Sequence, residues 1–313
     1  MPSIWPELPY ASWKDSGATL HMWLQIVGKY RLAHTPWVNH SWHATFYVSP
    51  RGLTTSLIHD GDQAVEITFD VIDHDLVLVS TRGAVTRLPL EPMTVAEFDQ
   101  RFQEKLRAIG ATPTYNGMPN EVQDPVPFAE QSAPGVYDYE AITRFWQALV
   151  SVDRVFKHFR TGFLGKVSPV HLFWGSLDLA VTRFSGRSAP LHPGGIPALP
   201  DEVTHEAYSH EVSSAGFWPG GGGVDEAMFY AYAYPTPDSF KDQPVKPATA
   251  FFHDGMGEFL LPYEAVRAAN DPDATLLTFL QSTYAAAADL AGWNREALDT
   301  PLAEAAVPRT VVF

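Results

Sequence analysis

The spacing of hydrophobic residues in the first third of the chain changes near residue 42. In residues 19–32 the apolar positions lie three or four residues apart, which predicts a helix. Later residues alternate in polarity or are rich in β-branched and aromatic types, in segments separated by turn residues. These segments are 42–49, 52–58, 64–72 and 75–80. The pattern predicts a helix followed by an antiparallel meander.

A second helix is predicted directly after this meander. Thr94 with Glu97 three residues later forms a capping box, and apolar residues share one helical face as far as Ile109, before Gly110 ends the helix. Residues 111–137 then contain five prolines and almost no periodicity. They are predicted to form a connection that lies across the surface.

The second half of the chain shows the same order of patterns. A long apolar stripe predicts a helix over residues 139–159, and an alanine-rich segment predicts a final helix over 273–293. Strand-like segments lie between them, at 170–184, 207–218, 227–234, 248–252 and 257–263. Each half therefore has the predicted order helix, strands, helix.

These patterns predict an α+β protein of two similar halves, each an antiparallel sheet with flanking helices. The residues IVGK at 26–29 and FLGK at 163–166 each close the first helix of a half. This favours an internal duplication with a crevice between the halves, and chance similarity is the alternative. The predicted divisions are a first half 1–110, a connection 111–137, a second half 138–300 and a tail 301–313.

Composition excludes several classes of function. The chain has 313 residues, no cysteine and a formal net charge of −15. Disulfides, iron–sulfur clusters, thiolate zinc sites and cysteine nucleophiles are therefore excluded. The negative charge and the lack of a Lys/Arg run argue against nucleic acid and acidic membranes as partners. Residues 1–13 lack a leader pattern and no window has eighteen uncharged apolar residues, so we expect a soluble, cytoplasmic protein of undetermined oligomeric state.

The first segment with candidate chemistry is residues 169–187. Period-two alternation places Trp174, Ser176 and Asp178 on one strand face with small residues. A face that is polar, small and aromatic fits a ligand-facing wall better than open solvent. The alternative is that these polar groups satisfy one another inside a sandwich.

The second segment is residues 204–223, where histidines lie beside glutamates. An imidazole next to a carboxylate often carries out proton transfer near neutral pH. Such a pair can also stabilise the end of a strand. We predict catalytic roles for His210, Asp178 and Glu211. Substrate binding is predicted for Trp174, Ser176, Tyr208, Trp218, His43 and Tyr47, the last two on a strand face expected to meet the polar stripe of the first helix.

Known cofactor and metal motifs are missing from the sequence. The chain has twelve histidines but no HExxH spacing, and its close histidine pairs would point apart on regular strands. We therefore predict no metal site. Dinucleotide, phosphate-loop and α/β-hydrolase motifs do not occur either, so the cofactor is left open. The aromatic content, 13% of the residues, favours a pocket for a small-molecule ligand, and oversized cores are the alternative.

Four long segments carry a resemblance to a known family. They are TLHMWLQIVGKYRL, NHSWHATFYVSPRGLTTS, SPVHLFWGSLDLAVTRFSGR and EAYSHEVSSAGFWPG. They resemble the signature blocks of a widespread bacterial family known only as a domain of unknown function, over roughly residues 5–298. The resemblance implies no reaction, cofactor or site residue, and residues 304–313 lie outside it.

Several functions remain open from the sequence. The leading interpretation is an enzyme that acts on a small organic substrate by His/carboxylate acid–base chemistry. The alternatives are a non-catalytic small-ligand binding or sensing protein, a metal-dependent enzyme with a His/carboxylate site, and a structural or partner-binding protein. A deep cavity lined by Trp, His and a carboxylate would favour the first.

Overall fold

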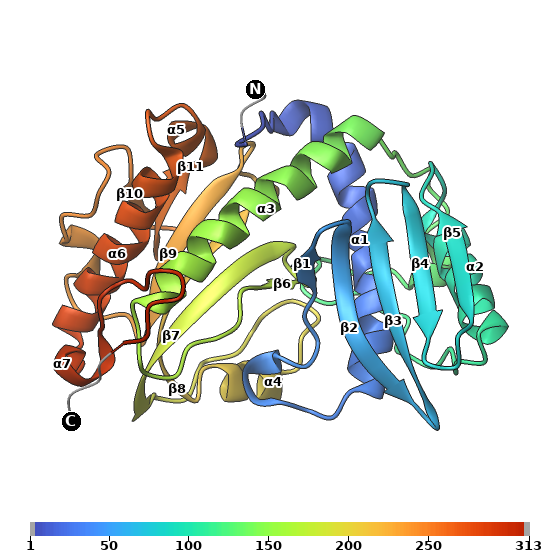
Figure 1. The fold of residues 1–313 in the computed structure, drawn as a ribbon, viewed down its shortest axis with the longest axis horizontal. Helices are drawn as coiled ribbons and strands as arrows, with labels where there is room; N and C mark the ends of the chain where they lie inside the picture. Colours follow the sequence, from blue (N-terminus) through green and yellow to red (C-terminus); the bar gives the residue numbers. More distant parts are fainter. Residues whose placement is uncertain (1–3, 310–313) are drawn as a thin grey trace.

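The computed structural model describes residues 4–309, which form two antiparallel sheets lying side by side (Figure 1). The first sheet is a meander of five strands: β1 (Tyr47–Ser49), β2 (Gly52–Asp60), β3 (Gln63–Asp70), β4 (Asp75–Ser80) and β5 (Val85–Pro89). The second has the order β10-β11-β9-β8-β7-β6, with β6 (His171–Phe173), β7 (Asp178–Ser188), β8 (His210–Trp218), β9 (Met228–Tyr234), β10 (Phe251–His253) and β11 (Glu258–Pro262). The predicted α+β class with two sheet-containing halves is confirmed.

The two sheets meet at their β1 and β6 edges. Just before β1, Phe46 forms an antiparallel bridge with Leu172 of β6, in which each backbone N–H donates to the other residue's carbonyl at 2.8–2.9 Å. This pairing satisfies backbone groups that two open sheet edges would otherwise leave free. The bridge thereby joins the two sheets edge to edge.

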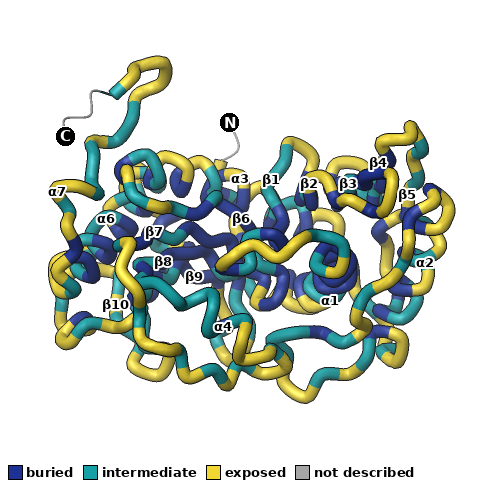
Figure 2. The backbone as a smooth tube through the Cα atoms, turned by 90° about the horizontal axis from the view of Figure 1, so that it is seen from below, coloured by how far each residue is buried: buried dark blue, intermediate teal, exposed yellow. Residues whose placement is uncertain are grey.

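Long helices cover one face of each sheet (Figure 1). In the first half these are α1 (Tyr10–His34) and α2 (Val95–Ala108), and in the second α3 (Tyr139–Thr161) and α6 (Pro272–Leu290). Shorter helices are α4 (Asp201–Ala207), α5 (Tyr263–Arg267), α7 (Arg295–Leu298) and the 3-10 turns at Asn39–Ser41, Phe128–Glu130 and Phe240–Asp242. Figure 2 shows the strands and inner helix faces buried, with exposed residues in the outer connections.

Aromatic and aliphatic side chains fill the space between helices and sheets. In the first half, Trp23 of α1 stacks on Phe98 of α2 with ring centroids 4.7 Å apart. In the second half, the guanidinium of Arg183 lies 3.6 Å from the ring centroid of Phe159 and donates to that residue's carbonyl at 2.6 Å. Arg183 is 1% exposed at this contact.

The local signals for helices predicted their positions well. The Thr94 hydroxyl accepts from the Glu97 N–H at 3.0 Å and α2 ends beside Gly110, whose φ of 76° is left-handed. The helices expected at 19–32, 139–159 and 273–293 are present as α1, α3 and α6. Residues 111–137 contain only the short 3-10 turn, because their prolines interrupt regular hydrogen bonding.

Three strand predictions need correction. Residues 42–45 form a turn and irregular backbone, so the expected strand face shared by His43 and Tyr47 does not form. The segment 170–184 is a hairpin of β6 and β7, because a turn at 174–177 interrupts it. The segment 207–218 is strand only from His210, since α4 precedes it.

An internal duplication stays a prediction. Both halves begin with a long helix and contain an antiparallel sheet, and their first strands meet at the bridge described above. In the second half, α4 lies between β7 and β8. The segment IVGK at 26–29 was wrongly predicted to close the first helix, because it lies inside α1, which extends to His34. The sheets differ at the far edge, where β11 lies between β9 and β10 in the second sheet. Of the predicted tail, residues 310–313 lie outside the described residues.

Candidate functional site

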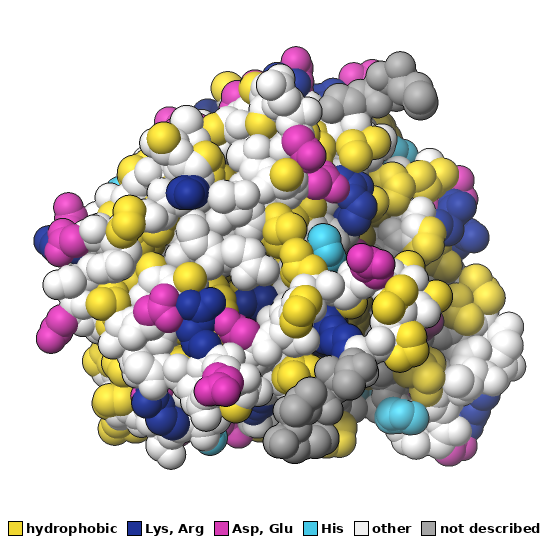
Figure 3. Space-filling view, turned by 60° about the vertical axis from the view of Figure 1, so that its left-hand side comes forward, with side chains coloured by type: hydrophobic (Ala, Val, Ile, Leu, Met, Phe, Trp, Pro, Cys, Tyr) yellow, Lys and Arg dark blue, Asp and Glu magenta, His cyan; other side chains and the backbone are white. Residues whose placement is uncertain are grey.

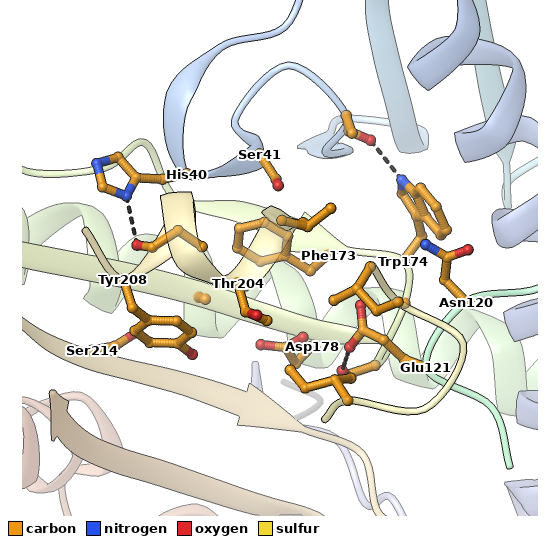
Figure 4. A pocket seen from close by; sticks show the side chains of 18 of the residues that line it. His40, Ser41, Asn120, Glu121, Phe173, Trp174, Asp178, Thr204, Tyr208 and Ser214 are labelled. Atoms are coloured by element: carbon orange, nitrogen blue, oxygen red, sulfur yellow. Dashed lines mark hydrogen bonds between the residues drawn. The ribbon is translucent and has the colours of Figure 1, made fainter. Parts of the chain in front are cut away.

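A cavity of about 810 Å³ lies on the face of the second sheet that α3 and α6 leave uncovered (Figure 4). Its floor comes from β7, β8, β9 and β11, and its walls from α1, α4, the 173–176 turn and the connection between the halves. Side chains from both halves therefore line one space. The volume is within the range of small-molecule sites.

Strand register determines which residues face the cavity. Thr182 of β7 pairs with Ser214 of β8, and Ser214 pairs with Tyr232 of β9. Side chains two residues apart share a face, so Asp178 and Tyr230 lie on the same side as these three. All five line the cavity. The hydroxyls of Thr182 and Ser214 are hydrogen-bonded, with Oγ1 of Thr182 2.8 Å from Oγ of Ser214.

The tyrosine hydroxyls extend this polar floor. Tyr232 and Tyr208 place their hydroxyl oxygens 2.9 Å apart. Tyr230 donates to Oδ2 of Asp178. Burial raises the pKa of all three tyrosines, and the charge of Asp178 adds to the effect. The phenols therefore stay protonated and act as hydrogen-bond donors or acceptors at neutral pH.

Asp178 is the most deeply buried acid of the cavity. It is 9% exposed, and burial raises its pKa to about 7, against the lowering effect of the Tyr230 hydrogen bond. Gly216 makes room for Tyr230, since a Cβ there would lie 2.2 Å from the ring's Cζ. A glycine on β8 thus holds the phenol in position against the carboxyl.

A second carboxyl approaches from β11. Glu258 is half-buried, with its pKa raised to about 7 by burial and by the charge of Asp178. Phe259 pairs with Ala231, so Glu258 stands beside Tyr232 at the edge of the floor. The charge of Asp178 thus disfavours ionisation of Glu258.

A third carboxyl comes from the connection between the halves. Glu121 accepts from the Ser176 hydroxyl, and burial raises its pKa while Lys29 lowers it (Figure 4). Its carboxyl packs on Gly175, where a Cβ would lie 1.9 Å from Oε1. The turn between β6 and β7 and the proline-rich connection therefore hold each other in place.

A polar stripe on α1 fixes this connection. Gln25 donates from Nε2 to the Asn120 carbonyl and accepts the Asn120 N–H at Oε1, both at 2.8 Å. Lys29 donates to Oδ1 of Asn120, and His21 Nε2 lies 2.8 Å from the Gly175 carbonyl. Burial lowers the pKa of Lys29 to about 8. The stripe thus meets the connection rather than the strand residues predicted to face it.

Trp174 forms the wall between the two halves. Its indole Nε1 donates to the Ala44 carbonyl at 2.7 Å, as drawn in Figure 4. The ring lies flat against α1, because a Cβ on Gly28 would be 2.5 Å from that nitrogen. A helix residue without a side chain therefore allows the indole to close one side of the cavity.

His40 connects the first half to α4 on the other side. Nδ1 lies 2.6 Å from the Ala207 carbonyl (Figure 4), and Nε2 lies 2.8 Å from Lys166 Nζ. Burial lowers the pKa of His40, and the charge of Lys166 adds to this. A neutral ring that donates from Nδ1 and accepts at Nε2 satisfies both contacts. Both ring nitrogens of His40 therefore make contacts that hold the first half against the second.

The predicted site residues divide into two groups. Those that line the cavity are Asp178, Trp174, Ser176, Tyr208 and Trp218. Those that do not line it are His210, Glu211, His43 and Tyr47.

Each of these four residues has other neighbours. Glu211 lies on the opposite strand face from Ser214, where it pairs with Arg187 at 2.7 Å. His210 contacts the Ser209 hydroxyl at 3.0 Å. The His43 ring lies on Trp37, and Tyr47 lies under the guanidinium of Arg31. The structure therefore does not bring Glu211 together with Asp178.

Four important cavity residues were missed by sequence reasoning: Lys29, Glu121, Tyr230 and Glu258. Alternation in AMFYAYAY does place Tyr230 and Tyr232 on one face, which was an available signal. Glu121 lies in a segment without periodicity, so its position depends entirely on contacts with the rest of the fold. Glu258 is the first residue of β11 and directly follows a short turn.

Among residues 4–309, no group of three or more His, Cys, Asp or Glu side chains is placed to hold a metal ion. In the same range no helix is long and apolar enough to cross a membrane. Basic and acidic side chains are interspersed on the face seen in Figure 3.

The fold and the cavity together define an α+β protein with a buried, carboxyl-rich pocket between two sheet-containing halves. The chain belongs to the family of unknown function DUF5996, which it matches over residues 5–300. The expectation of a family without an established function is thereby confirmed. No curated protein and no solved structure matches the chain.

Proposed function

We propose that this protein is an enzyme that acts on a small organic substrate, with Asp178 and Glu258 as its acid and base. The observation that carries the proposal is that Asp178 and Glu258 line one cavity, where burial raises the pKa of each carboxyl to about 7. An acid or base is most effective when its pKa is close to the working pH. Perturbed carboxyls that share one cavity are also typical of catalytic sites.

The surroundings of the pair support defined roles for other residues. Tyr230 donates to Oδ2 of Asp178 and acts as a positioning residue for this carboxyl. Trp174, Tyr208 and Trp218 supply aromatic surface for the substrate body. His210, Glu211, His43 and Tyr47 have no part in this proposal, because they do not line the cavity.

The protonation behaviour of the pair can be tested without a known substrate. Carboxyl carbons labelled with ¹³C are followed by NMR from about pH 3 to pH 9 in the wild type, Asp178→Asn and Glu258→Gln. We expect two carboxyls that titrate near pH 7, with one signal lost in each variant. Titration of both groups below about pH 5 would refute the proposal, because neither would then hold a transferable proton at neutral pH.

Turnover is tested with a fractionated metabolite extract incubated with wild type or Asp178→Asn and compared by mass spectrometry. The proposal expects at least one compound that the wild type consumes and the variant does not. A compound that both proteins bind and neither changes would instead support the binding or sensing alternative, which rests on the same aromatic walls. The exposed Asp225→Asn variant is the matched control and should behave as wild type.

A further inference from the structure

The charges that line the cavity are out of balance. Three carboxyls face it, and Lys29 is the one lysine or arginine among its described lining residues. None of the ion pairs within residues 4–309 involves Asp178, Glu121 or Glu258. Buried carboxyls are normally paired with a cation or held neutral. Among the described lining residues, Asp178 and Glu258 therefore have no lysine or arginine to balance the charge that they carry when ionised.

The nearest basic groups are already engaged elsewhere. Lys29 donates to Asn120 and interacts chiefly with Glu121, which leaves Asp178 and Glu258 without a basic partner. His40 is neutral, with both ring nitrogens in contact. The remaining titratable groups that face the pair are phenols: Tyr208 after α4, and Tyr230 and Tyr232 on β9. They supply hydrogen bonds but no positive charge.

Aromatic faces around the cavity already accept cations from the protein itself. Lys166 Nζ lies 5.2 Å from the centroid of Trp42, and Lys29 Nζ lies 5.7 Å from that of Trp174. The rings of Phe173, Tyr208 and Trp218 line the same space. Aromatic faces combined with carboxylates are the usual means of recognising an organic ammonium group.

We infer that the ligand class of this cavity is a small organic cation, a protonated amine attached to an apolar or aromatic body. The ammonium group pairs with the ionised carboxyl of Asp178 and Glu258, the protonated partner remains available as the acid, and the body contacts the aromatic walls. This inference rests on the proposed function, since it assigns the substrate class of the same site. A cavity of about 810 Å³ accommodates such a molecule.

The experiment compares amines with neutral molecules of the same shape. Binding of benzylamine and 2-phenylethylamine is measured by calorimetry against benzyl alcohol and 2-phenylethanol. We expect each amine to bind at least about tenfold more tightly than its alcohol near pH 8, because hydrogen bonds to charged groups are the stronger ones. Asp178→Asn and Glu258→Gln should each weaken amine binding by about tenfold, and Asp225→Asn should not.

The pH dependence gives an independent readout. An ammonium ligand requires one ionised carboxyl, so its affinity should rise by up to about tenfold per pH unit between about pH 5 and pH 7 and then level off. Protons released on binding make the measured enthalpy depend on the buffer. A neutral ligand that hydrogen-bonds to a protonated carboxyl would show the opposite trend.

The inference is overturned if no amine binds, if the alcohols bind as tightly, or if amine affinity falls as the pH rises. Its failure is distinguishable from failure of the proposed function. Carboxyls that titrate near pH 7 together with no preference for amines would refute only the ligand class. Carboxyls that titrate below about pH 5 together with an amine preference would refute only the acid–base role.

Discussion

Replacement of Asp178 by asparagine is expected to stabilise the protein at neutral and alkaline pH. Asparagine keeps the shape of the side chain and an oxygen that accepts from Tyr230, but it carries no charge. The pKa of Asp178 rises from 3.8 to about 7 on folding. Since one pH unit corresponds to about 1.4 kcal/mol, the buried carboxylate lowers the free energy of unfolding by at most about 4 kcal/mol.

The sign follows from comparing the folded and unfolded chains. Below about pH 4 the carboxyl is protonated in both, so its burial has little differential effect. Between about pH 4 and pH 7 the unfolded chain loses the proton first, and the free energy of unfolding falls as the pH rises. Above about pH 7 both forms are ionised and the full penalty applies. The stabilising effect of Asp178→Asn should therefore grow across this window.

Urea denaturation followed by tryptophan fluorescence at several pH values measures the effect. We expect a difference between Asp178→Asn and wild type that is small at pH 4 and reaches about 2–4 kcal/mol at pH 8, after allowance of about 1 kcal/mol for the amide donors. Asp225→Asn should show no such change. A difference independent of pH, or a variant less stable than wild type at pH 8, would refute the reasoning.

Three further substitutions test the supports of the site. Gly216→Ala should destabilise the protein by about 1–3 kcal/mol in urea denaturation and weaken ligand binding, because its Cβ would displace the Tyr230 ring. Gln25→Ala leaves the N–H and carbonyl of Asn120 without partners, so hydrogen exchange around Asn120 should speed up and stability should fall by about 2–3 kcal/mol. Thr94→Ala removes the cap of α2 and should lower the free energy of unfolding by about 1 kcal/mol.

Each of these predictions has a matched control. Gly117→Ala introduces a Cβ with no heavy atom within 4 Å and should be neutral. Gln100→Ala changes an exposed glutamine of α2 and should leave hydrogen exchange at the connection unchanged. Thr94→Ser keeps the capping oxygen and should retain most of the stability. Equal effects in a variant and its control would contradict the contact on which that prediction rests.

Local sequence signals determined the elements because those signals act over a few residues. The cap at Thr94, the stop at Gly110 and the apolar stripe of residues 139–159 each specify a helix through short-range hydrogen bonding and spacing. Alternation also placed Asp178 on the face that now lines the cavity. Periodicity failed where backbone turns interrupt it, as at 174–177.

Tertiary structure alone decided which acids meet. Asp178, Glu258 and Glu121 come from two strands and a proline-rich connection, and no local pattern relates them. Strand pairing and the contacts of Gln25 bring them to one cavity, where burial raises their pKa values. Glu121 and Glu258 are 137 residues apart in the chain, so their proximity depends on how the elements pack together. The sequence by itself therefore determined the two sheet-containing halves. Strand pairing in the second sheet and packing against the first half decided the chemistry of the cavity.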